Sequence, residues 1–114
     1  GNLSVLYGLQ GTPYSLNAII DNCVEPPVLL IEDICERHYH IDRMMNNLRL
    51  SGVLSRLSGV IVGQFTDCDD DPKMGCTLRE TLQYYLDQYD HPVVWDAPYG
   101  HEDDNRPIMF SLNV

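Results

Sequence analysis

Two short apolar runs with an amphipathic segment between them most constrain what this chain can fold into. The first run, residues 28–31 (VLLI), is too short for a core helix and lies directly after two prolines, so it predicts a buried strand. Residues 41–50 then have apolar side chains at helical spacing, and residues 60–62 (VIV) form the second run. A strand, a helix and a strand in this order predict the crossover unit of a parallel sheet.

The predicted helix over residues 41–50 has signals at both of its ends. Asp42 lies in its first turn and Arg49 in its last, where their charges complement the helix dipole, and Gly52 is a stop signal. The residues expected on its buried face are Ile41, Met44, Met45, Leu48 and Leu50.

Two carboxylates, Glu32 and Asp33, directly follow the first predicted strand. In α/β folds, ligands and chemistry gather where strands give way to loops at the carboxyl edge of the sheet. We therefore expect both carboxylates to lie at that edge, where the strand gives way to a loop.

Helices are also predicted near both ends of the chain. Thr77 followed by Glu80 makes a capping box for a helix over residues 77–89, which has an apolar stripe. Asn2 is the expected N-cap of a short helix that has Leu3, Leu6, Tyr7 and Leu9 on it and ends at Gly11.

The remaining predicted strands are short. Residues 93–95 (VVW) predict a third strand, and residues 108–110 (IMF) predict a last one, with Leu112 continuing its inward face. Residues 15–27 have no sustained period and predict a surface connection with one short strand over residues 18–20. Together the elements predict a single α/β domain with a small, mainly parallel sheet, antiparallel edge strands and flanking helices.

Length and charge limit the possible functions. A chain of 114 residues is one domain, and it is small for a complete enzyme with its own cleft. Its net charge of −10 argues against a nucleic-acid partner, which needs a basic surface. No apolar run approaches the length of a membrane span, and no signal peptide is visible. Because the chain opens on Gly1-Asn2 without Met, we expect an excised domain of a longer protein.

The cysteines show neither a CxxC pair nor the spacing of a metal finger. We interpret them as reduced thiols of a cytosolic domain, while two disulfides stay open because the count is even. They are Cys23, Cys35, Cys68 and Cys76.

The loop over residues 67–71 (DCDDD) has the composition of a site for a hard cation. A calcium loop, however, needs a glycine at its sixth position and a glutamate at its twelfth. Counted from Asp67, these positions hold Pro72 and Leu78. We therefore interpret the segment as a solvated turn.

Glu32 and His101 have the chemistry of a general base and its orienting group. A hydrolase with a serine nucleophile needs a base for the hydroxyl proton and a third group that orients the base. Histidine is the natural base and a carboxylate the natural orienting group. Both residues follow an apolar strand and a turn, so neighbouring parallel strands can bring them together. From the residues alone, an ordinary ion pair and two separate solvated side chains are the alternatives.

Three segments, in order and at matching separations, resemble the C-terminal domain of the LD-carboxypeptidases. These are serine peptidases of the muramoyltetrapeptide carboxypeptidase type, and they include the microcin-immunity peptidases. The resemblance covers nearly the whole chain, and it implies the swivelling β/β/α fold of that domain within a two-domain parent. The segments are IEDICERHYHIDRMMNNLRLSGVL, GVIVGQFTDC and PYGHEDDNRP.

The resemblance also implies which residues form the site. The family uses a Ser-Glu-His triad, in which the Glu matches the first acidic residue after the VLLI strand and the His matches that of Gly100-His101. By position, Glu32 orients and His101 is the general base, with no cofactor and no metal ion required. Glu36 is the competing carboxylate, although it is displaced from the strand tip. The competing histidines are His38, His40 and His91, and packing or surface roles fit the last two better.

The nucleophile and the oxyanion-hole amides of the family belong to its N-terminal domain, which is absent here. We therefore expect this chain alone to be inactive. No serine lies in the strained Gly-x-Ser-x-Gly elbow that exposes a nucleophile; the serines are Ser4, Ser15, Ser51, Ser55, Ser58 and Ser111. The sequence also departs from the family at Cys35, where relatives commonly have glycine, so the turn there must accommodate a side chain.

The reaction implied for the parent is hydrolysis of the bond between an L-centre diamino acid and the terminal D-alanine of murein tetrapeptide. It belongs to cell-wall recycling in the cytoplasm, and family members are commonly homodimers. Two alternatives stay open. One is a related amidase that shares the triad and acts on a peptidyl-nucleotide antibiotic. The other is a non-catalytic acidic module that binds cations, which the aspartate-rich loops favour.

Overall fold

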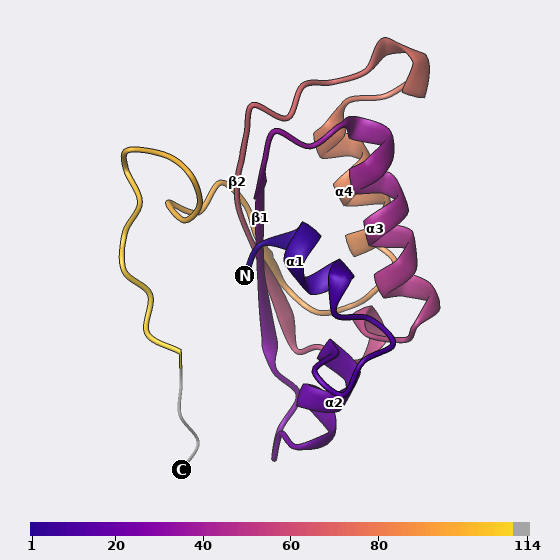
Figure 1. The fold of residues 1–114 in the computed structure, drawn as a ribbon, viewed down its shortest axis with the longest axis vertical. Helices are drawn as coiled ribbons and strands as arrows, with labels where there is room; N and C mark the ends of the chain where they lie inside the picture. The colour runs from indigo at the N-terminus through magenta and orange to yellow at the C-terminus, as the bar shows by residue number, and fades with distance from the viewer. Residues whose placement is uncertain (111–114) are drawn as a thin grey trace.

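A parallel sheet of three strands forms the centre of the domain (Figure 1). The computed structural model describes residues 1–110. Strand β1 (Val28–Ile34) pairs with β2 (Gly59–Thr66), which pairs with the short β3 (Val93–Val94). The predicted strands near residues 28, 60 and 93 are therefore confirmed, and so is the crossover unit.

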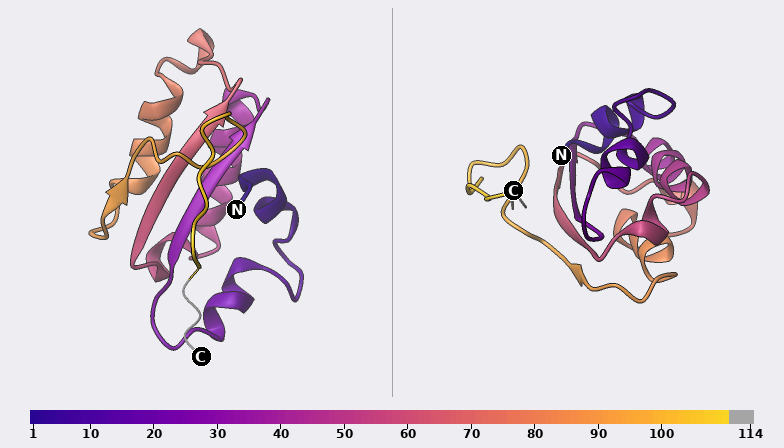
Figure 2. Two further views of the ribbon diagram at one scale, coloured as in Figure 1. Left: turned by 90° about the vertical axis from the view of Figure 1, so that its left-hand side faces the viewer. Right: turned by 90° about the horizontal axis from the view of Figure 1, so that it is seen from below.

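Helices cover one face of this sheet. Helix α3 (His38–Leu50) connects β1 to β2, and α4 (Leu78–Leu86) packs beside it. The short α1 (Leu3–Gly8) lies on the same face, and the tail after β3 passes over the opposite face (Figures 1 and 2). Three further short elements connect these parts: α2 (Leu16–Asp21), η1 (Leu54–Arg56) and η2 (Pro72–Met74).

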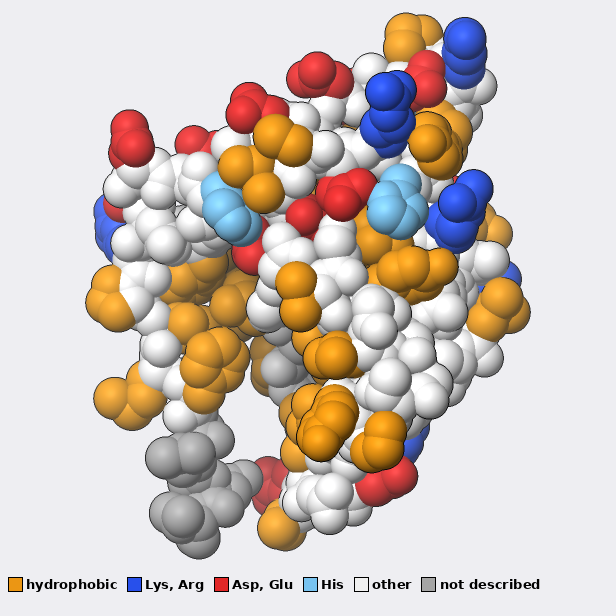
Figure 3. Space-filling view, in the orientation of Figure 1, with side chains coloured by type: hydrophobic (Ala, Val, Ile, Leu, Met, Phe, Trp, Pro, Cys, Tyr) orange, Lys and Arg blue, Asp and Glu red, His pale blue; other side chains and the backbone are white. Residues whose placement is uncertain are grey.

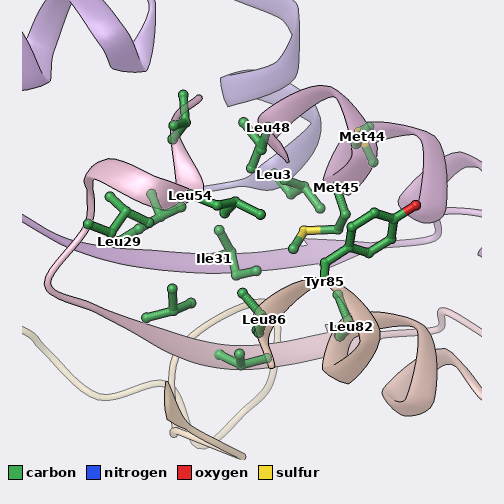
Figure 4. Close-up of a cluster of buried hydrophobic side chains, with 14 of the residues drawn as sticks. Leu3, Leu29, Ile31, Met44, Met45, Leu48, Leu54, Leu82, Tyr85 and Leu86 are labelled. Carbon is green, nitrogen blue, oxygen red and sulfur yellow. The ribbon is translucent and has the colours of Figure 1, made fainter. Parts of the chain in front are cut away.

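The core lies between the helices and the sheet (Figure 4). Because neighbouring residues of a strand point to opposite faces, alternate apolar residues of β1 and β2 meet the buried stripes of α3 and α4. Each such side chain contributes roughly 1.5–3 kcal/mol relative to leaving it exposed. The main contributors are Leu29, Ile31, Val60, Val62, Met44, Met45, Leu48, Leu82, Tyr85 and Leu86.

Helix α3 begins three residues before the predicted start at Ile41, because Arg37 is its N-cap. Asp42 consequently lies beyond the first turn, where it accepts a hydrogen bond of 2.8 Å from the Tyr85 hydroxyl of α4. The prediction that Leu50 belongs to the buried face is wrong, since its side chain is 70% exposed. Two residues beyond Leu48, it points to the opposite side of the helix. The remaining residues of the predicted stripe are buried.

The predicted caps of α1 and α4 are confirmed. The Asn2 side chain accepts from the backbone of Val5, and Thr77 and Glu80 form the reciprocal capping box. Helix α4 ends at Leu86, before the predicted end at Tyr89.

The predicted strand over residues 18–20 is wrong, because these residues belong to helix α2. The Ser15 hydroxyl caps this helix by accepting a hydrogen bond from the backbone of Ala18. Ile20 then faces the core while Ile19 is exposed, as helical geometry requires for two successive residues.

The predicted strand over residues 108–110 is also wrong, and Leu112 lies outside the described residues. Met109 and Phe110 are exposed, and the tail passes in front of the sheet rather than along one of its edges (Figure 2). A strand needs a partner at a sheet edge, which this path does not reach. Within residues 1–110 all strand pairing is parallel, so the expected antiparallel edge strands are not among them.

None of the helices formed by residues 1–110 combines the length and the apolar character that crossing a membrane requires.

Candidate active site

Strand β1 continues through Glu32 and Asp33 and ends at Ile34, so it is longer than the apolar run over residues 28–31 that predicted it, and both carboxylates lie in its last residues. The register explains why. Ile31 pairs with Val62 and Asp33 pairs with Phe65, so that β2 has two residues opposite the single residue Glu32. This is a β-bulge, which keeps the strands paired while it changes the direction of the side chains.

The carboxylates of Glu32 and Asp33 lie on opposite faces of the sheet. Asp33 is buried on the helix side, where it holds the start of the chain against β1. Its carboxylate accepts hydrogen bonds from the Asn2 amide at 3.0 Å and from the Ser4 backbone and hydroxyl at 2.9 and 2.6 Å. These donors fully engage Asp33, so its role here is structural.

Glu32 lies on the other face and contacts His101. Its Oε2 is 2.8 Å from Nδ1 of His101, and the exposed fractions of the two side chains are 12% and 46%. An ionised carboxylate only accepts hydrogen bonds, so Nδ1 of His101 must carry the hydrogen. In the neutral ring, Nε2 then holds the free lone pair, and within residues 1–110 no side chain is hydrogen-bonded to it. The pair therefore has the geometry of a base and its orienting group.

The segment between β3 and His101 is attached to β2. The backbone of Ala97 donates to Val62, and the backbone of Gln64 donates to Tyr99 at 2.8 Å. After His101, the Glu102 carboxylate accepts a hydrogen bond of 2.8 Å from the Thr66 hydroxyl at the end of β2. Through these contacts the chain crosses the second face of the sheet, which is the face opposite the helices, and His101 lies beside β1.

A non-glycine residue with positive φ follows each of the three strands. Cys35 has φ 55°, Asp67 has φ 52° and Asp96 has φ 56°. Residues other than glycine rarely adopt this left-handed backbone conformation, and those that do concentrate at functional sites. Cys35 thus adopts, as a non-glycine residue, a turn conformation that glycine would favour. Acidic and histidine side chains also gather at this end of the domain (Figure 3).

The competing residues Glu36 and His40 also contact each other, but they belong to a different hydrogen-bond network. Nδ1 of His40 lies 2.7 Å from Oε2 of Glu36, while the other oxygen of Glu36 is 2.8 Å from the Ser4 hydroxyl. The His40 ring also has an edge contact with Tyr7. Glu36 therefore connects α3 to the start of the chain, and it does not reach His101.

The other competing histidines are held by packing contacts. His38 is buried, accepts from the backbone of Asp71 at Nδ1, and lies 2.7 Å from the Thr81 hydroxyl through Nε2. His91 bonds the Leu54 carbonyl and stacks on Tyr89. Neither contacts a carboxylate through its ring.

The aspartates of the loop over residues 67–71 are partly engaged in local structure. Asp70 accepts from the backbone of Leu78, and Asp71 caps η2 by accepting from Lys73. A pocket of about 400 Å³ lies between this loop and the start of α3. Among residues 1–110, no cluster of three or more His, Cys, Asp or Glu side chains is arranged to bind a metal ion.

The described serines are engaged elsewhere than at His101. Ser4 contacts Asp33, and Ser15 caps α2, while the hydroxyls of Ser51 and Ser55 donate to backbone carbonyls of their own turns. Ser58 uses its backbone to bond Pro27. Ser111 lies outside the described residues. All four cysteines are free thiols.

Sequence reasoning missed the residues that bring the pair together, namely Gly63 and Gln64 of β2. A hypothetical Cβ on Gly63 would lie 2.4 Å from the Tyr99 carbonyl oxygen and 3.3 Å from the Cβ of Glu32. A glycine inside a strand often marks a bulge or a close backbone approach, and this was the available signal.

These features define an α/β domain with a carboxylate–histidine pair on the face of a parallel sheet that the helices do not cover. Residues 1–114 match the family model described as the LD-carboxypeptidase C-terminal domain. The chain is 36% identical to a candidate carboxypeptidase of Synechocystis sp. over 102 residues, which cover 89% of the chain and 32% of that protein.

Solved structures agree with this match. The muramoyltetrapeptide carboxypeptidase of Oxalobacter formigenes aligns with a TM-score of 0.74 and 28% identity, over 92% of this chain and 35% of that one. The microcin C7 self-immunity protein in complex with aspartyl sulfamoyl adenosine aligns with a TM-score of 0.65 and 24% identity, over 86% and 28% of the two chains, and shares the fold.

The chain therefore belongs to the LD-carboxypeptidase C-terminal domain family. It spans about a third of the length of the relatives that it matches.

Proposed function

We propose that this chain is the C-terminal domain of a longer serine-type LD-carboxypeptidase, in which Glu32 and His101 are two members of a Ser-Glu-His triad. The substrate is murein tetrapeptide, and the bond cleaved joins its L-centre diamino acid to the terminal D-alanine. The observation that carries the proposal is the 2.8 Å contact between Oε2 of Glu32 and Nδ1 of His101. The family match and the name of the Oxalobacter formigenes relative support the reaction and the substrate.

The pair would act by moving one proton in two steps. Nε2 of His101 takes the proton of the serine hydroxyl as the oxygen attacks the scissile carbonyl carbon. The imidazolium that forms is stabilised by the Glu32 carboxylate through Nδ1–H. His101 then gives the proton to the departing amine of D-alanine, and the acyl group stays on the serine until water removes it.

The serine would come from the N-terminal domain of the same polypeptide. Support comes from the 46% exposure of the His101 side chain and from the hydroxyls of Ser4, Ser15, Ser51 and Ser55, which have hydrogen-bond partners other than His101. In this proposal the 114-residue chain alone is inactive, and the complete protein works as a homodimer in the cytoplasm during cell-wall recycling.

The test is the turnover of muramoyl tetrapeptide by the full-length protein and by its Glu32→Ala and His101→Ala variants. Removing either member of a triad should lower kcat by about a thousandfold or more. The matched controls are Glu36→Ala and His40→Ala, because this second glutamate–histidine pair has nearly the same separation, 2.7 Å. Both control variants should keep kcat within about threefold of the parent enzyme.

Each result separates the proposal from its competitors. Near-normal turnover by a folded Glu32→Ala or His101→Ala variant would exclude the assigned roles. A parent that is inactive on the tetrapeptide but cleaves a peptidyl-nucleotide would show the amidase alternative instead. A full-length protein inactive on both substrates that binds a divalent cation would favour the acidic binding module.

A further inference from the structure

The backbone of residues 97–100 crosses β2 at a glycine. Gly63 is buried, and its missing side chain would point to the second face of the sheet, between Glu32 and the crossing segment. A Cβ there would lie 2.4 Å from the carbonyl oxygen of Tyr99 and 3.3 Å from the carbonyl oxygen of Ile31. A contact of 2.4 Å between carbon and backbone oxygen is far inside van der Waals distance, so the crossing needs a residue without a side chain.

We infer that Gly63 is a positioning residue for the Glu32–His101 pair. It lets the Tyr99 carbonyl approach β2 closely enough for His101, two residues later, to reach the carboxylate of Glu32. The inference rests on the proposed function only in assuming that catalysis uses the Glu32–His101 pair. The positioning itself concerns two side chains whose contact the structure contains.

Gln64, the second residue of the bulge, holds the crossing segment in place. Its backbone nitrogen donates to the Tyr99 carbonyl at 2.8 Å, and its side-chain amide donates to the Ala97 carbonyl at 3.1 Å. Gly100 fits against the same residue, since a Cβ there would lie 3.2 Å from the Gln64 carbonyl oxygen. The bulge thus supplies both the space and the hydrogen bonds for the crossing.

The position of His101 decides which ring nitrogen carries the hydrogen. Beside Glu32, the neutral ring is held with its hydrogen on Nδ1, which leaves Nε2 as the base. Displaced from Glu32, the ring is free to place its hydrogen on Nε2, and a base in that form cannot accept a proton there. Gly63 therefore affects the chemistry through the tautomer of His101, without touching a substrate.

The test compares Gly63→Ala with the matched control Gly8→Ala, because a Cβ on Gly8 meets nothing within 4 Å. Imidazole ¹⁵N spectra of the 114-residue chain, recorded at a pH where the rings are neutral, report the tautomer of each histidine. The unchanged chain and Gly8→Ala should show His101 with hydrogen on Nδ1. Gly63→Ala should shift His101 to the Nε2–H form, as Glu32→Ala does, and adding Gly63→Ala to Glu32→Ala should change nothing further.

His38 provides the internal control for folding, because its ring is held by Asp71 and Thr81 on the helix side of the sheet. A Gly63→Ala chain with native His38 signals and an unchanged His101 tautomer would overturn the inference. If the His38 signals are lost, Gln64→Leu replaces it, and an unchanged His101 tautomer in that folded variant would overturn the inference equally.

Activity measurements then separate this inference from the proposed function. In the full-length enzyme, Gly63→Ala should lower kcat about a hundredfold with little change in KM, since misplacing a catalytic group by about 1 Å costs that much. If the tautomer shifts while kcat stays normal, the positioning is correct and the triad assignment is wrong.

Discussion

Oε2 of Glu32 lies 2.8 Å from Nδ1 of His101, although 69 residues separate them in the chain. The contact forms on the face of the sheet that the helices leave open, and both partners reach it through irregular backbone. Glu32 lies opposite a bulge in β2, and His101 follows a segment that crosses that bulge. The His101 side chain is 46% exposed beside this contact.

The pair should behave as one unit in catalysis. Because each member works only through the other, combining Glu32→Ala with His101→Ala should lower kcat of the full-length enzyme by less than about tenfold beyond either single variant. Steady-state kinetics on muramoyl tetrapeptide measure this. If the loss of kcat in the double variant equals the product of the two single losses, the residues act independently, contrary to the proposed triad.

Asp33 should matter for stability. Asp33→Ala removes a buried carboxylate and leaves the partly buried donors of Asn2 and Ser4 without their acceptor, so we expect a loss of about 3 kcal/mol in the free energy of unfolding. Urea denaturation followed by circular dichroism measures it. The exposed Asp90→Ala is the matched control and should change stability by no more than about 0.5 kcal/mol. Equal stability of the two variants would contradict the role given to Asp33.

Replacing His38 should lower the stability of the domain more than replacing His101. His38→Ala removes a fully packed ring and two hydrogen-bond partners, so it should lower stability by about 3 kcal/mol. His101→Ala removes a half-exposed ring and should cost less than about 1 kcal/mol. Urea denaturation of both variants checks this order, and the reverse order would refute it.

Cys68 should react with alkylating reagents more slowly than Cys23. Burial, together with the nearby charges of Asp33 and Glu36, raises the pKa of the Cys68 thiol. Since the thiolate is the reactive form, a raised pKa leaves less thiolate at pH 8. The difference between the two alkylation rates should therefore narrow as the pH rises above 9. Cys23 is exposed and serves as the reference. Timed iodoacetamide labelling with mass spectrometry measures both rates; equal rates at pH 8 would contradict the expectation.

Local patterns predicted the elements that depend on local interactions. The stripe Ile41, Met44, Met45 and Leu48 gave helix α3, the pair Thr77 and Glu80 gave the cap of α4, and the apolar runs gave the parallel strands. Two segments with weaker patterns were predicted wrongly. Residues 18–20 became helical because Ser15 caps them and Ile20 faces the core. Residues 108–110 formed no strand because the path of the tail misses the sheet edges.

The sequence by itself determined the fold class and the two residues of the candidate site, because hydrophobic period, caps and the three family-like segments are all properties of the chain order. It identified Glu32 and His101 as residue types in matching motifs, but it could not show that they touch. Only the tertiary structure decided that. The close passage of Tyr99 over the bulge at Gly63 and Gln64 depends on hydrogen bonds between segments more than thirty residues apart. The glycine inside β2 signals a close backbone approach, but it does not identify the segment that approaches.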